Sequence, residues 1–297
     1  SLTFNSAGSV VVSEDTATVL SGTSTALSLD LDSTGSITDE DNANITVTDL
    51  ADITGTSISL GDHATTDIAN FGSLTINSGG LVTVYEDSST LLSGTSLVSN
   101  LDLKSTAAIT NADSASLTVQ NLGKLEGTSI TIGDEVSDTI NFGEITVVSA
   151  GAVTVSEDSD TEFSGTSTAL SLDLDSSGAI TDKDSASLTV TNLADFAGTS
   201  ITLGDHATDD TVALGSLLFN SAGDVSISEN DGDGTLLSGA NSAQNLTLAS
   251  TGAITDSVAT TLAVTGLATI GNGGAGVITL GDNIGDATNF GTLNLNG

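Results

Sequence analysis

An internal repeat is the feature that most constrains the fold of this chain. The segment SLTFNS at residue 1 returns as SLTINS at 73, EITVVS at 144, SLLFNS at 216 and TLNLNG at 292. Repeated units of this kind bury their apolar faces by stacking on their neighbours. We therefore interpret the chain as one continuous solenoid divided into repeat 1 (1–72, three coils), repeat 2 (73–143), repeat 3 (144–215), repeat 4 (216–291) and the start of a fifth (292–297).

A shorter period lies within each long repeat. Three versions of a short strand end in an acid, as in VVVSE at 10–14, SITD at 36–39 and SISLGD at 57–62. Eleven of the twelve terminal positions are carboxylates, and successive position numbers differ by 23 to 27. This spacing predicts a coil of about 24 residues, repeated twelve times. We call these positions the acid series: Glu14, Asp39, Asp62, Glu86, Asn111, Asp134, Glu157, Asp182, Asp205, Glu229, Asp256 and Asp282.

The strand pattern predicts an all-β fold. Apolar residues alternate with polar ones, Gly, Asn, Asp and Ser lie between the runs, and no window has a helical period. Three short strands per coil of this length are typical of a parallel β-helix, and the absence of proline suits strands that pair on both sides. Four tandem β-sandwiches are the rival interpretation, which we disfavour because sandwiches do not need the shorter period and usually contain proline and a core Trp or Tyr.

The composition excludes several classes of protein. The chain carries 39 acidic residues, three lysines and no arginine, for a net charge of -36, so it cannot neutralise the phosphates of a nucleic acid. No apolar run approaches the roughly 20 residues that cross a bilayer, and the acidity opposes anionic lipid, so we expect no membrane insertion. Without cysteine there is no disulfide or thiolate metal site. The 37% apolar content indicates a folded chain.

The acid series is the sharpest candidate site. If successive coils stack in register, its members form a column about 4.8 Å apart, in which like charges repel. Hydrogen bonds from turn amides would relieve this repulsion, in which case no cofactor is required. Alternatively, the series binds Ca²⁺, which takes six to eight oxygen ligands, although the glycine-rich nonapeptide calcium motif is absent.

Other chemistries have weaker signals. A polysaccharide-cleaving β-helix would use paired carboxylates, yet a regularly repeated acid is not a unique site, so we expect no enzyme activity. His63 and His206 each follow Gly-Asp and are interpreted as solvated side chains. Thr46-x-Thr48 and Thr189-x-Thr191 would suit an ice-binding face, but they recur only once per long repeat.

The repeated motifs LSGTSTA, STGAITD, LTVTNLA and GTSITLGD resemble the repeat regions of filamentous-haemagglutinin-like bacterial exoproteins and giant surface adhesins. This resemblance implies a right-handed β-helix shaft that is secreted to the bacterial surface. We expect a structural or adhesive fibre segment that associates with itself, with neighbouring repeats and with a cell-surface receptor or glycan. A calcium-stabilised cell-adhesion or S-layer-like module is the alternative.

Overall fold

The computed structural model describes residues 1–62, 67–206, 209–274 and 276–297. It divides into two compact units, unit 1 (Ser1–Gly143) and unit 2 (Glu144–Gly297). The boundary between the units coincides with the start of repeat 3. Every regular element of the described residues is a β-strand, and none of these residues forms a helix able to span a membrane.

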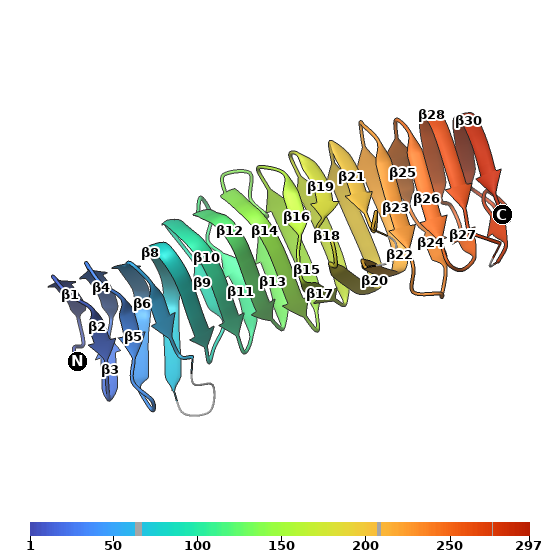
Figure 1. The fold of residues 1–297 in the computed structure, drawn as a ribbon. Coiled ribbons are helices and arrows are strands. Elements are labelled where there is room, and N and C mark those ends of the chain that lie inside the picture. Colours follow the sequence, from blue (N-terminus) through green and yellow to red (C-terminus); the bar gives the residue numbers. More distant parts are fainter. Residues whose placement is uncertain (63–66, 207–208, 275) are drawn as a thin grey trace. The chain divides into compact units, whose positions relative to one another are not determined.

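Thirty strands make up the described part of the fold (Figure 1). The first fourteen are β1 (Ser9–Glu14), β2 (Thr18–Leu20), β3 (Thr23–Ala26), β4 (Ser28–Ser33), β5 (Ile37–Asp39), β6 (Asn44–Gly55), β7 (Ile58–Leu60), β8 (Ile68–Glu86), β9 (Thr90–Leu92), β10 (Thr95–Ser105), β11 (Ala108–Asn111), β12 (Ser116–Gly127), β13 (Ser129–Ile132) and β14 (Thr139–Ser149). The others are β15 (Ala152–Glu157), β16 (Thr161–Phe163), β17 (Thr166–Ala169), β18 (Ser171–Ser176), β19 (Ala179–Asp182), β20 (Ser187–Gly198), β21 (Ser200–Leu203), β22 (Thr211–Ser221), β23 (Val225–Glu229), β24 (Thr235–Leu237), β25 (Ala240–Ala243), β26 (Leu246–Ser250), β27 (Ile254–Asp256), β28 (Thr261–Gly271), β29 (Ile278–Thr279) and β30 (Ala287–Asn296).

The alternating sequence pattern determines which side chains face the core. In β4, Leu29 and Leu31 are buried, whereas Asp30 and Asp32, which alternate with them, are exposed. The same alternation in the other strands lines each unit with Leu, Ile, Val and Phe side chains. Each strand therefore contributes one apolar face to the interior, as its period of two requires.

Parallel pairing stacks the strands of each unit into a β-solenoid, which confirms the expected fold class. In unit 1, one line of axial neighbours runs Val10, Leu29, Ala51, Leu74 and Leu92. The position number advances along this line by 19, 22, 23 and then 18. Because each of these steps is shorter than the predicted period, the structure has about 13 turns where the sequence predicts twelve coils.

A long repeat does not contain a whole number of turns. Leu2 and Leu74 hold the same place in repeats 1 and 2, but they lie on different lines of axial neighbours. Leu74 lies with Ala51 and Leu92 on the line that begins at Val10. Leu2 pairs with Leu20, which lies on another line. The two lines differ because Leu20 pairs with Asp39, whereas Val10 of the same coil pairs with Leu29. Residues that correspond in sequence thus fall on different sides of the solenoid.

A serine turn closes many of the strands. Ser33 Oγ donates to the Thr16 carbonyl at 2.6 Å and accepts the Gly35 amide at 3.2 Å. Ser105 and Ser176 make equivalent pairs of bonds. The side chain thereby satisfies backbone groups at a corner where the chain leaves one strand for the next.

Candidate functional site

The acid series does not form the predicted column of carboxylates. The axial partner of Glu14 is Ser33, that of Asp39 is Leu20, and that of Asp182 is Phe163. The reason is that a coil is shorter than the spacing of the acid series. The next member of the series therefore lies further along the chain than the residue that stacks on the previous member, as Asp39 lies beyond Ser33. The series instead separates into three structural classes, one for each place in the long repeat.

The first class consists of the glutamates of the series, of which Glu86, Glu157 and Glu229 are buried. Glu86 is 2% exposed and accepts the Thr90 hydroxyl at 2.5 Å and the Phe71 amide at 2.8 Å. Glu229 is 1% exposed and accepts equivalent bonds from Thr235 and Leu214. Burial raises the pKa of Glu86 and of Glu229 to about 7, although these hydrogen bonds oppose the rise. Glu157 shares the burial and the threonine bond.

The second class accepts a bond from a glycine amide one coil away. Oδ2 of Asp39 accepts from Gly61 at 2.9 Å, and Asp182 and Asp256 accept from their own glycines in the same way. The other oxygen, Oδ1, is buried in all three aspartates without a hydrogen-bond partner among the described residues. Asn111 takes this place in repeat 2, and its Oδ1 accepts from Gly133 at 2.9 Å.

The third class is exposed and follows a glycine with positive φ. Its members are Asp62, Asp134, Asp205 and Asp282.

Sequence reasoning missed a fourth set of acids. Asp67, Asp138, Asp210 and Asp286 each follow the exposed aspartate by four or five residues. Their carboxylates accept backbone amides, for example Ser185 N to Asp210 Oδ1 at 2.8 Å and Thr260 N to Asp286 Oδ1 at 3.1 Å. The recurrence of Gly-Asp followed by a second Asp in all four repeats was the available signal.

The fold brings these sets together. Carboxylate oxygens of Asp39, Asp62 and Asp67 lie within 4.8 Å of one another, as do those of Asp256, Asp282 and Asp286. We call these the repeat 1 cluster and the repeat 4 cluster. Each combines one aspartate from the strand end of one coil with two from the following turn, so the stacking of coils creates the cluster.

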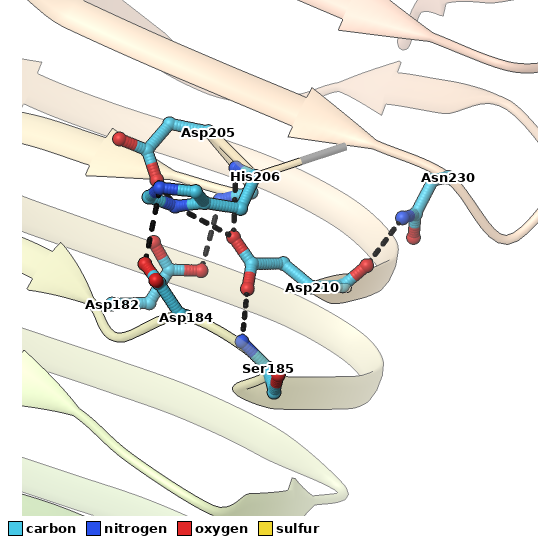
Figure 2. Close-up of polar contacts among 8 residues, drawn as sticks. Asp182, Asp184, Ser185, Asp205, His206, Asp210 and Asn230 are labelled. Atoms are coloured by element: carbon cyan, nitrogen blue, oxygen red, sulfur yellow. Dashed lines mark hydrogen bonds and ion pairs between the residues drawn. The ribbon is translucent and has the colours of Figure 1, made fainter. Parts of the chain in front are cut away.

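In repeat 3 a histidine contacts two of the corresponding acids, Asp205 and Asp210 (Figure 2). His206 Nδ1 lies 2.9 Å from Asp205 Oδ1, and Nε2 lies 3.0 Å from Asp184 Oδ1. Partial desolvation lowers the pKa of His206, but the carboxylates of Asp184 and Asp205 outweigh it and raise the pKa overall. An imidazolium there would act as the counter-charge for the acids. Its repeat 1 counterpart, His63, lies outside the described residues.

In repeat 2 an amide bridges the corresponding acids. Asn111 Nδ2 donates to Asp138 Oδ2 at 2.7 Å and to the Ala112 carbonyl at 3.2 Å. The neutral side chain therefore supplies a donor where the other repeats present a carboxylate oxygen.

Burial and neighbouring charges affect Asp39 and Asp182 alike. The pKa of Asp39 rises to about 6, chiefly by desolvation, with Asp67 and Asp62 adding to the rise and the Gly61 amide opposing it. The pKa of Asp182 rises to about 6 for the same reasons. A proton or a cation stabilises such a group of facing carboxylates.

Stacked acids do occur, but at mid-strand positions outside the acid series. Asp30 pairs directly with Asp52, and Asp173 with Asp195. Desolvation and the neighbouring acids raise the pKa of Asp52, and they raise that of Asp195 to about 6.

Repeat 2 replaces this acid pair with opposite charges. Asp102 pairs with Lys124, whose Nζ lies 3.5 Å from Asp102 Oδ1, and Lys104 Nζ lies 2.6 Å from Glu126 Oε1. In repeat 2 a lysine thus replaces one acid and removes the repulsion that remains in repeats 1 and 3.

Comparison with known proteins gives one partial match. Residues 150–216 are similar to a family described as repeats of unknown function (DUF5649). No curated protein and no solved structure matches the chain. The match supports a repeat protein and assigns no activity to it.

Proposed function

We propose that this chain is a structural segment of a secreted bacterial surface or extracellular-matrix fibre, with a mechanical rather than an enzymatic role. The observation that carries the proposal is the continuous parallel backbone pairing within each unit, where neighbouring coils share long registers such as β20 with β22. Force along the stack of coils would be distributed over many hydrogen bonds and a buried apolar core. The resemblance to filamentous-haemagglutinin-like repeats supports the extracellular location.

Self-association is the second part of this proposal. β30 pairs with β28, and its side chains are exposed along almost its whole length, including Leu293 and Leu295. A strand with a coil on one side offers backbone groups to a further strand on the other. We propose that a second copy of the chain pairs there.

Sedimentation and negative-stain electron microscopy over a concentration series test the assembly. We expect concentration-dependent end-to-end particles, which the variant Leu293→Lys/Leu295→Lys abolishes because lysines on an edge strand oppose pairing. The control, Leu97→Lys/Leu170→Lys, changes two similarly exposed leucines away from β30. Single particles of the unaltered chain at every concentration contradict self-association.

Binding to a cell surface is tested with beads coated with the chain. We expect them to adhere to cells or to immobilised glycans more strongly than beads coated with an unrelated acidic protein. Equal adhesion rejects the adhesive role and leaves the chain as a passive shaft.

A further inference from the structure

We propose that the repeat 4 cluster of Asp256, Asp282 and Asp286 binds a divalent cation with oxygen ligands, of which Ca²⁺ is the best fit. This inference does not depend on the fibre proposal.

The first step is the unpartnered oxygen. Asp256 is only 9% exposed, and its Oδ1 is buried without a hydrogen-bond partner among the described residues. A buried polar atom without a partner carries a desolvation penalty that native proteins usually relieve. A ligand in contact with Oδ1 would remove that penalty.

The direction of this oxygen follows from repeat 2. Oδ2 of Asp256 accepts the Gly281 amide at 2.8 Å, just as Oδ1 of Asn111 accepts that of Gly133. The remaining atom of Asn111, Nδ2, lies 2.7 Å from Asp138, the counterpart of Asp286. Oδ1 of Asp256 therefore points toward the carboxylate of Asp286, which makes two acceptors face each other.

A cation suits this place better than a hydrogen-bond donor from the protein. Asp286 already accepts amides from Thr260 at 3.1 Å and Asn283 at 2.6 Å, which fix the carboxylate in place. Three carboxylates within 4.8 Å of one another provide the hard oxygen ligands that Ca²⁺ prefers, with water completing its shell. In repeat 2, Asn111 places a nitrogen donor where repeat 4 has Oδ1 of Asp256, and in repeat 3, His206 Nδ1 lies 2.9 Å from Asp205, the counterpart of Asp282.

The repeats provide a substitution that preserves the fold. Because asparagine occupies the equivalent position naturally in repeat 2, Asp256→Asn should fold normally while replacing a ligand oxygen with an amide donor. The reverse change, Asn111→Asp, should create a third acidic cluster with Asp134 and Asp138. Asp15→Asn removes an exposed charge outside the clusters and serves as the matched control.

Calcium titration by isothermal calorimetry and equilibrium dialysis tests the inference on chelator-treated protein. At about 0.15 M NaCl, which shortens the Debye length to about 8 Å, binding to the general negative charge is suppressed. We expect one saturable site in the unaltered chain and in Asp15→Asn, with a dissociation constant of about 10⁻⁴ to 10⁻³ M as in extracellular calcium modules. Asp256→Asn should have no site, and Asn111→Asp should have two.

Two results overturn the inference. One is the absence of saturable calcium binding in the unaltered chain. The other is an equal number of sites in Asp256→Asn and Asp15→Asn when circular dichroism shows both to be folded. The gain of a site in Asn111→Asp cannot result from unfolding, so it separates ligand loss from structural damage.

Discussion

At the scale of the residue, burial gives the glutamates of the acid series a role different from that of surface charges. Glu86 and Glu229 satisfy a threonine hydroxyl and a strand amide inside the solenoid. Their pKa values rise from an ordinary 4.5 to about 7 because burial penalises the charged form. These side chains couple the stability of the coils to pH.

We predict that the free energy of unfolding falls as the pH rises from about 4.5 to about 7. Over this window the folded chain holds protons on Glu86 and Glu229 that the unfolded chain has already released, so raising the pH favours unfolding. The loss is about 1 to 3 kcal/mol per carboxyl and is complete above pH 7. Asp39, Asp182 and Asp195 act in the same direction between about 3.8 and about 6.

Urea unfolding at pH 5 and pH 8 measures this dependence. Glu86→Gln/Glu229→Gln should be more stable than the unaltered chain at pH 8 and should lose much of the pH dependence, because the amide carries no charge. Glu40→Gln, at an exposed position, is the control. A double variant with the unaltered chain's pH profile would show that these glutamates do not titrate on unfolding.

One glycine is required by both conformation and space. Gly61 has φ +69°, and a Cβ there would lie 2.2 Å from the carbonyl oxygen of Tyr85. We predict that Gly61→Ala lowers the free energy of unfolding by about 2 kcal/mol or more. Gly79 has open space around its Cα, so Gly79→Ala should change stability by less than about 0.5 kcal/mol. Thermal unfolding followed by circular dichroism compares the two, and equal losses would contradict the explanation.

At the scale of the element, neighbouring strands determine whether a charge stabilises the solenoid. Asp30 beside Asp52 is repulsive, whereas Asp102 beside Lys124 is attractive at the corresponding place in repeat 2. Cross-strand pairs contribute up to about 1 kcal/mol, and like charges directly opposite one another destabilise.

We predict that Asp52→Lys stabilises the chain by roughly 0.5 to 1 kcal/mol at low salt, by reproducing the pair found in repeat 2. Asp49→Lys makes the same change of charge at an exposed position outside this pair. Urea unfolding at low and high salt separates the effects, because screening should reduce the difference between the variants. A gain in Asp49→Lys as large as that in Asp52→Lys would attribute the effect to net charge alone.

At the scale of the whole molecule, the net charge of -36 opposes the compact state. Among the ion pairs of the described residues, Lys104, Lys124 and Lys183 each contact glutamate. Three lysines cannot compensate 39 acids. Self-repulsion therefore remains over most of the surface.

We predict that NaCl raises the melting temperature, because it shortens the Debye length from about 30 Å at 0.01 M to about 3 Å at 1 M. Differential scanning calorimetry measures the shift, with sucrose at equal osmolality as the uncharged control. A melting temperature that is independent of NaCl would show that charge repulsion contributes little to stability.

The fold class could be predicted from the sequence, whereas the arrangement of the candidate site could not. Alternation in segments such as SLDLDS identifies Leu29 and Leu31 as core and Asp30 and Asp32 as surface without any knowledge of neighbours. Asp67 and Asp286 were missed because their importance comes from the coil against which their turns fold. The predicted column placed Asp39 above Glu14, although Glu14 pairs with Ser33.

The sequence by itself determined the strands, their inward faces and the fourfold repetition, because these depend on local alternation and turn residues. Only the tertiary structure decided which acids meet. The length of each coil decides which residues stack on one another. Each step along the line from Val10 to Leu92 is shorter than the period of about 24 residues in the acid series, so successive members of the series do not stack. Positions that are equivalent in sequence are therefore separated in space, while Asp256, Asp282 and Asp286, which belong to different places in the repeat, come together.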